Sequence, residues 1–222
     1  HALRDGLHAG TLVLCHGDIA QEVLDAHPDC FCVVMVQEGE GFSWAQEKRR
    51  RGRVLVVRQI ERFYHYDSLL QRLFVNDLVW ENEMDRVVYS RGRLDKLIAV
   101  SEGILGNFVC ITGTGYNLIA YSRTVEPPRG GGYSQLVSTN CYSKGAIGDI
   151  EQKVLGVVRA NSRLVVCDPA GDCPYPVLHY PIFINGAYLF HVAMPCCCGT
   201  LACLQDLSLK FVRRVEALCN DF

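Results

Sequence analysis

The sequence lacks both a long apolar run and a strong charge of one sign. No stretch approaches the roughly 18 uninterrupted apolar residues of a membrane-spanning helix. No basic-then-apolar segment of the secretory type stands at the beginning. The net charge is −2, so the chain has no concentrated positive field for displacing counterions from DNA phosphates. These absences predict a cytoplasmic protein without membrane or direct DNA contact.

Recognisable catalytic motifs are also missing. The glycine clusters at 113–115 and 130–132 have neither the Lys-Ser/Thr of a phosphate loop nor a helix-opening G-x-G-x-x-G context. There is no G-x-S-x-G elbow. Cys15 and His16 are neighbours in sequence, but nucleophilic catalysis requires apposition in space, which adjacency does not provide. We expect no catalytic residue, no cofactor and no enzymatic activity.

The one basic run, residues 48–53 (KRRRGR), leaves two interpretations open. It is either a phosphate-binding patch or the solvated end of a helix, where cations suit the helix dipole. We favour the helix end, because the rest of the chain is not basic.

Cysteine, in contrast, is abundant, with 12 residues. Four of them lie inside apolar runs typical of strands: Cys15, Cys32, Cys110 and Cys167. Thiols in such runs behave as small buried hydrophobes. This pattern differs from the loop-rich scaffold of a small disulfide protein. We expect mostly free thiols in a reducing cytoplasm.

The first 65 residues alternate apolar runs with helical stretches. The runs are 11–15, 31–36 and 54–57, and the helical stretches are 18–26 and 42–51. We expect Asp18 to be the N-cap of the first helix. Continuous β-branched runs separated by helices predict a small three-stranded parallel α/β unit.

Residues 66–105 predict a long helical connector, with apolar residues at spacings of three and four. Asp77, Arg91 and Ser101 interrupt the apolar stripe, and Gly92 is a plausible break into two helices. Two interpretations stay open: a helix that faces the core of its own chain, and a helix that pairs in a parallel dimer.

The remaining residues, 106–222, predict an antiparallel sheet with flanking helices. One hairpin joins 107–112 to 116–122, and another joins 177–184 to 187–194 across Asn185 and Gly186. Between them we expect a loop over 126–132, helical stretches over 134–140 and 144–158, and a strand over 163–167. An amphipathic helix over 201–218 closes the chain. The layout is that of an α+β sensor.

The segments "GNFVCITGTGYNLIAYS" and "VLHYPIFINGAYLFHVAMP" resemble the strand pairs that open and close the sheet of a GAF-type sensory domain. With the α/β unit in front, the chain resembles the sensory N-terminal region of purine-catabolism-regulator-like (PucR-type) bacterial transcription factors. The acidic residue usual in the first hairpin is Thr112 here.

The resemblance implies a small α/β domain (1–65), a helical connector (66–105) and a GAF/PAS-like domain (106–222). It also implies a homodimer that binds a small-molecule effector of unknown identity. The family's helix-turn-helix is absent, so DNA contact would come through a domain missing from this chain. Because the chain begins with His1 rather than Met, we expect it to be a fragment or a trimmed chain.

Six polar side chains lie on elements that could form the wall of an effector pocket between the sheet and its helices. They are Tyr121, Tyr133, Tyr142, His179, Tyr180 and His191. The most unusual motif is a cysteine cluster at 196–198 with Cys203. Cys198 and Cys203 have a spacing that a zinc ion accepts, but adjacent cysteines diverge, and we favour a linker without metal. Redox sensing by these thiols is a further alternative.

Three functions therefore remain in competition. We favour a ligand-sensing and dimerisation region of a transcriptional regulator. The alternatives are a structural protein-interaction domain without a ligand and a metal- or thiol-dependent enzyme.

Overall fold

The computed structural model describes residues 11–36, 54–58, 63–152, 156, 164–169 and 173–220. The chain divides into two compact units, His1–Val75 and Asn76–Phe222. Each unit has its own hydrophobic core. The finer division into 1–65, 66–105 and 106–222 stays a prediction. Within the described ranges, no helix has the length and apolarity that a bilayer crossing requires.

The first unit contains the predicted parallel sheet. Its strands β1 (Leu12–His16), β2 (Phe31–Val36) and β3 (Val54–Arg58) lie in the order β1-β2-β3 and are all parallel. Helix α1 (Gly17–Ala26) connects β1 to β2. Cys15 and Val34 pair in this sheet and are almost fully buried, because both faces of a parallel strand favour apolar side chains.

One prediction for this unit is wrong, and two others concern residues that the structure does not describe. Asp18 is not the N-cap of α1: the helix begins at Gly17, and His16 is the N-cap residue, without a side-chain capping bond. The physical reason is that β1 continues through His16, so strand and helix join without a connecting residue. The predicted helix over 42–51 and the basic run over 48–53 lie outside the described residues.

The predicted break at Gly92 is confirmed. Helix α3 (Phe63–Tyr89) ends before it and α4 (Leu94–Leu105) begins after it. The N–H of Gly92 donates to Val87 O at 2.8 Å and that of Arg91 to Val88 O at 2.9 Å, which is the Schellman pattern of a helix end. A Cβ atom at position 92 would lie 2.8 Å from Val87 Cγ1. Glycine is therefore needed here for close approach.

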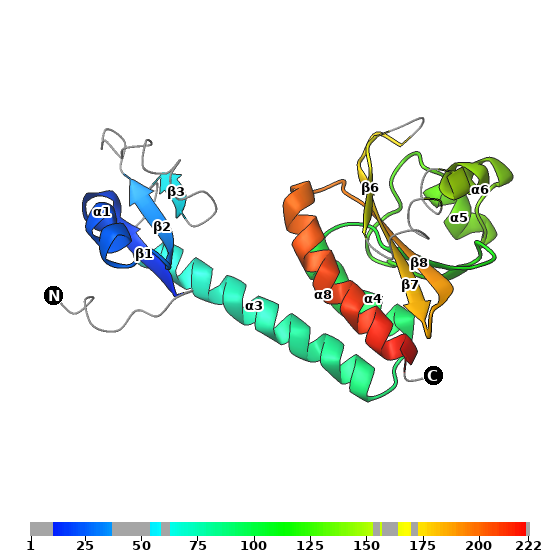
Figure 1. The fold of residues 1–222 in the computed structure, drawn as a ribbon, viewed down its shortest axis with the longest axis horizontal. Helices are drawn as coiled ribbons and strands as arrows, with labels where there is room; N and C mark the ends of the chain where they lie inside the picture. The colour runs from blue at the N-terminus through cyan, green and yellow to red at the C-terminus, as the bar shows by residue number, and fades with distance from the viewer. Residues whose placement is uncertain are drawn as a thin grey trace. The chain divides into compact units, whose positions relative to one another are not determined.

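The second unit is built on a five-stranded antiparallel sheet (Figure 1). The strand order is β5-β4-β8-β7-β6. The bounds are β4 (Cys110–Gly113), β5 (Leu118–Tyr121), β6 (Val165–Cys167), β7 (Val177–Ile184) and β8 (Ala187–Pro195). Both predicted hairpins, β4-β5 and β7-β8, are confirmed. Asn185 and Gly186 both have positive φ, 52° and 79°, as the tight turn of a two-residue hairpin requires.

Helices cover both faces of this sheet. On one face, Leu178, Ile182 and Met194 pack with Trp80 of α3, Leu97 of α4 and Phe211 of α8 (Leu201–Asn220). On the other face, Val177 and Ala193 pack with Tyr133 and Leu136 of α5 (Tyr133–Thr139) and with partly buried residues of α6 (Lys144–Ile150). Most of the predicted helical stretch beyond residue 152 lies outside the described residues. The side chains of each strand alternate between the two layers.

The residues that interrupt the apolar stripe of α3 and α4 have specific partners. Ser101 is fully buried, accepts a hydrogen bond from Trp80 Nε1 at 3.0 Å and donates to Leu97 O at 2.9 Å. The indole N–H is thereby satisfied inside the core, as burial of tryptophan requires. The stripe therefore faces the core of its own chain over Trp80–Leu105, which was one of the two open interpretations.

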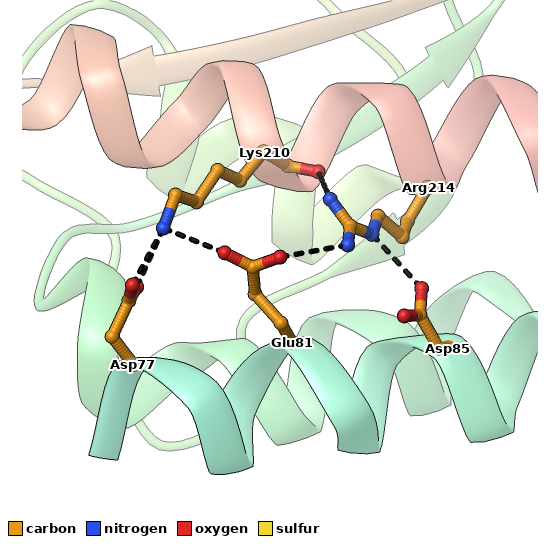
Figure 2. Close-up of polar contacts among 5 residues, drawn as sticks. All are labelled: Asp77, Glu81, Asp85, Lys210 and Arg214. Carbon is orange, nitrogen blue, oxygen red and sulfur yellow. Dashed lines mark hydrogen bonds and ion pairs between the residues drawn. The ribbon is translucent and has the colours of Figure 1, made fainter. Parts of the chain in front are cut away.

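Asp77 belongs to an ion-pair network that joins α3 to α8 (Figure 2). Lys210 bridges Asp77 at 2.6 Å and Glu81 at 2.7 Å, and Arg214 bridges Glu81 at 3.0 Å and Asp85 at 3.1 Å. Figure 2 shows the three carboxylates at successive turns of one helix, facing the two cations of the other. The Lys210 ammonium, which donates to Glu81, holds the pKa of that carboxyl below its ordinary value.

Glu81 is the one acid in this network that pairs with both cations, so its charge is the natural target for a test. Partly exposed ion pairs contribute about 0.2–1 kcal/mol each. We expect Glu81→Gln to lower the free energy of unfolding by about 1 kcal/mol at low salt. The loss should shrink at about 1 M salt, which screens such charges. Urea denaturation at two salt concentrations measures both effects.

Glu83→Gln is the matched control, because Glu83 is exposed on the same helix and takes no part in the network. Equal losses for the two variants, or a loss that does not depend on salt, would contradict the assignment.

Candidate ligand pocket

A cavity of about 280 Å³ lies beside the sheet face that α5 and α6 cover. Its wall includes Tyr133 and Gln135 of α5, Ala146 and Asp149 of α6, and Val177 and His179 of β7. The volume is just below the range of about 300–1,000 Å³ that ligand pockets occupy.

The glycine run at 130–132 brings the chain to this wall. Gly130, Gly131 and Gly132 have φ values of 91°, 63° and 71°, a succession that residues with a side chain avoid. A Cβ atom on Gly131 would lie 2.7 Å from Tyr133 Cε2. The predicted loop over 126–132 is confirmed, since it contains no helix or strand. Its glycines allow backbone to pack directly against the first tyrosine of the wall.

Two buried tyrosines, Tyr133 and Tyr142, belong to the wall. The ring of Tyr133 meets those of Phe108 and Tyr142 edge-on, with centroids 5.7 Å and 6.4 Å apart. The Tyr142 hydroxyl lies 3.7 Å from Cys110 Sγ. Burial raises the pKa of Tyr133 and of Tyr142 well above the ordinary value. Both hydroxyls are therefore neutral.

His179 and His191 form a stacked pair on the sheet face that α5 and α6 cover. Their ring planes differ by 11° with centroids 5.0 Å apart, and His179 Nδ1 lies 2.9 Å from His191 Nε2. Both are buried, with exposed fractions of 7% and 2%. Burial lowers the pKa of His179 well below its ordinary value, and the neighbouring His191 lowers it further. Burial lowers the pKa of His191 to about 4. Both imidazoles are neutral near pH 7.

Thr112, on the neighbouring strand β4, is a third buried polar residue beside the two histidines. It pairs directly with His191 in the β4-β8 register and is 1% exposed. Its hydroxyl has no hydrogen-bond partner among the described residues. An unpaired buried hydroxyl costs free energy. The Thr112 hydroxyl is therefore a polar group that the fold leaves unsatisfied on the strand beside the histidine pair.

The structure brings only part of the predicted set together. Tyr133, Tyr142 and His179 line the cavity, and His191 contacts it through His179. Tyr180 belongs to the opposite face, where its hydroxyl lies 2.6 Å from Ser208 Oγ of α8. Tyr121 lies apart from the lining, beneath the Arg123 guanidinium at 4.0 Å.

Sequence reasoning missed Gln135, Ser143 and Cys173, which also line the cavity. They lie on the short helix α5 and on connecting segments, where no periodic pattern marks them. Tyr180 could have been separated from His179, because adjacent strand residues point to opposite faces.

The cysteine cluster lies in the segment between β8 and α8, which hydrogen bonds to the Asn107 side chain hold in place. The Asn107 side chain accepts from the N–H groups of Cys197 and Cys198 at 2.7 and 2.9 Å and donates to Cys198 O at 3.0 Å. All twelve cysteines are free thiols, and Cys198 and Cys203 are exposed. In the described part of the chain, no group of three or more His, Cys, Asp or Glu side chains is placed to hold a metal.

A second hollow, of about 580 Å³, is lined by the connection between α3 and α4, by strand residues of both hairpins and by the end of α8. Its wall includes Ile119 and Leu189, the residues skipped by the strand pairing of β4-β5 and β7-β8, and both are exposed. Most of the wall is apolar, with Arg91 and Arg93 among its residues. We favour the first cavity as the candidate site, because buried polar groups converge on it.

Comparison with known proteins gives little. No protein-family model and no curated protein matches the sequence. Among solved structures, the chain is similar to the GAF domain/HD domain protein from Geobacter sulfurreducens, with 12% identity and a TM-score of 0.37. The alignment covers 58% of this chain and 93% of that one. A similarity of this size does not assign the chain to a family.

The buried histidine pair makes stability depend on pH. The pKa of His191 is lower in the folded protein than in the unfolded chain, so the unfolded state binds protons first as pH falls. Stability should therefore decrease between about pH 6.5 and pH 4, by on the order of 2 kcal/mol from this group. His191→Gln should show a shallower decrease over this window. Urea unfolding followed by Trp80 fluorescence, in a Trp44→Phe background, measures the slopes.

His27→Gln, which removes a histidine from the first unit, is the control and should leave the slope unchanged. Parallel slopes for the wild type and His191→Gln would show that the buried pair does not govern the pH dependence.

Proposed function

We propose that the second unit, Asn76–Phe222, is a sensory domain that binds a small, neutral, polar molecule in the cavity beside α5 and α6. The observation that carries this proposal is the convergence of Tyr133, Tyr142 and His179 on a cavity whose wall otherwise combines apolar and polar residues. Pockets for small molecules combine apolar walls with a few placed polar groups in this way.

The protonation states of these groups favour binding over catalysis. Burial raises the pKa of the Cys110 thiol to about 12, so the thiol nearest the Tyr142 hydroxyl is not a nucleophile at neutral pH. The pKa of His191, at about 4, is far from the value near 7 that suits a general base. We accordingly propose a binding domain rather than an enzyme.

The more specific part of the proposal is a ligand-sensing and dimerisation region of a PucR-type cytoplasmic transcriptional regulator. Its support is the resemblance described above, whose two segments contain the hairpins β4-β5 and β7-β8. A ligand that binds one of two dimer arrangements better than the other would shift their populations. DNA contact would then belong to a separate domain.

Helix α3 supports the dimer. Six of its apolar side chains are between 45% and 63% exposed: Leu69, Leu73, Phe74, Val75, Leu78 and Val79. Exposed apolar side chains gathered on one helix are typical of a surface that another chain covers. The same side chains favour the second candidate function, a protein-interaction domain without a ligand.

The ligand proposal is tested by filling the cavity. Ala146→Phe places a ring in the cavity wall and should abolish the thermal stabilisation that a bound small molecule gives. Hypoxanthine, a small neutral purine, is the first probe, at millimolar concentration in a thermal-shift measurement. We expect it to raise the melting temperature of the wild type and not that of Ala146→Phe.

Ala99→Phe is the matched control, because Ala99 is exposed on α4, away from the cavity. Equal stabilisation of Ala146→Phe and the wild type would place binding elsewhere. No stabilisation of any variant, with hypoxanthine or a broad panel of neutral metabolites, would leave the protein-interaction function as the better proposal.

The dimer proposal is tested on α3. Leu69→Glu with Leu73→Glu places two charges on one face of the helix, where residues four apart are neighbours. We expect the wild type to sediment as a dimer in analytical ultracentrifugation and the double variant as a monomer. Asn82→Glu, exposed on the same helix, should leave the dimer intact. A monomeric wild type at high concentration would refute a dimer.

A further inference from the structure

The second hollow, of about 580 Å³, has a mostly apolar wall that draws on α4, β5, β7, β8 and α8. Two of its apolar side chains, Ile119 and Leu189, are 44% and 39% exposed. Exposed apolar side chains that border a hollow are typical of a surface that a ligand or partner covers. The apolar residues of the wall are Leu94, Ile119, Ile184, Leu189, Phe190 and Leu218.

This hollow is separate from the cavity beside α5 and α6. Among the described residues, the two walls have none in common. A ligand of the second hollow would therefore be additional to that of the proposed function. Burial raises the pKa of the Cys219 thiol in its wall to about 11, and the nearby Glu216 carboxylate adds to the shift. The thiol is thus neutral at pH 7 and adds to the apolar part of the wall.

The charged side chains of the wall leave one cation unpaired. Arg93 and Asp95 form a two-point ion pair: Arg93 Nη2 lies 3.2 Å from Asp95 Oδ2, and Arg93 Nε donates to Asp95 Oδ1 at 3.2 Å. Asp95 is the one acid among the described residues of the wall, and Arg93 balances its charge. Arg91 is exposed and has no ion-pair partner among the described residues. The wall therefore has one net positive charge.

The backbone holds this cation in place. Arg91 has a φ of 49° and occupies the position after the end of α3 where the Schellman pattern usually has glycine. The turn alone would favour glycine, so the turn does not account for arginine. Arg93 is the N-cap of α4 and makes no side-chain capping bond. The positive end of the α4 dipole therefore lies beside the two arginines.

We propose that the second hollow binds an amphipathic carboxylate, an apolar chain or ring with one carboxylate group. Its apolar part would cover the wall formed by the strands and α8, and its carboxylate would pair with Arg91 at the beginning of α4. Burial of apolar surface supplies the affinity, whereas the unpaired cation selects the sign of the head group.

The head group is tested with three probes of equal chain length: octanoate, octan-1-ol and octyltrimethylammonium. Isothermal titration of the full chain should show octanoate binding at least about fivefold more tightly than the alcohol, which is the upper end for an exposed ion pair. The ammonium ion should bind more weakly still. Equal or tighter binding of the alcohol or the ammonium ion would overturn the proposal, as would no binding of octanoate at millimolar concentration.

The apolar part is tested with hexanoate, octanoate and decanoate. Each methylene that enters an apolar site should tighten binding by about threefold. Affinity that does not change with chain length would overturn the assignment of the hydrocarbon to this wall.

The function of Arg91 is tested without straining the turn. Arg91→Asn removes the charge, and asparagine tolerates the left-handed conformation. We expect this variant to bind octanoate about fivefold more weakly and octan-1-ol as the wild type does. Arg129→Asn, which removes an exposed arginine outside the wall, is the control and should bind both as before. Unchanged octanoate binding by Arg91→Asn would overturn the head-group assignment.

Three further variants locate the site. Ile119→Glu places an acid in the wall and should weaken octanoate binding by at least about tenfold. Leu209→Glu changes a residue of α8 that is also exposed, at 42%, but lies outside the wall, and should have no effect. Equal losses would indicate general binding to exposed apolar surface and overturn the proposal. Ala146→Phe, which fills the first cavity, should bind octanoate normally; a loss there would place octanoate in that cavity instead.

Discussion

The second unit depends on one geometric constraint: its sheet has helices on both faces. Alternate residues of β7 and β8 must therefore suit two different layers. Leu178, Ile182 and Met194 enter the layer of α3, α4 and α8. His179 and Ala193 point the other way, toward α5 and its neighbours. Because the two sets interleave in sequence, the core and the candidate pocket share the same strands.

The two layers differ in how they are held. The layer of α3, α4 and α8 has long helices, the buried bond from Trp80 to Ser101 and the network centred on Glu81. The other layer has two seven-residue helices, α5 and α6, and a cavity. Regions with fewer buried contacts open more readily. This division suits a domain whose stable half preserves the fold while its other half responds to a ligand.

Local patterns predicted most of the fold, because the determinants were local. The β-branched runs of the first unit, the Asn185-Gly186 turn and the break at Gly92 each depend on residues close in sequence. The functions of Asn107 and Asp77 could not be predicted in the same way. Their partners lie about 90 and 133 positions away, and only the folded chain brings them together.

The pairing of His179 with His191 shows why half of the candidate site was also beyond local reasoning. The Asn185-Gly186 turn pairs Ile184 with Ala187 and Phe183 with Tyr188. Continued regularly, this register would pair His191 with Tyr180, whereas the observed partner of His191 is Pro181 and His179 lies diagonally across, opposite Ala193. A register shift between Ile182 and Phe183 skips Leu189 and moves the pairing by one residue. No sequence pattern announces this bulge, although it decides which polar residue faces the cavity.

The skipped residue also bears on how this hairpin can change over evolutionary time. Leu189 has no partner in the ladder and is 39% exposed. Its deletion would leave the pairs on either side, Phe183 with Tyr188 and Ile182 with Phe190, able to form a regular ladder. The bulge thus accommodates one extra residue between the turn and the interior of the sheet. Homologous hairpins could gain or lose one residue here without re-sorting the side chains of either layer.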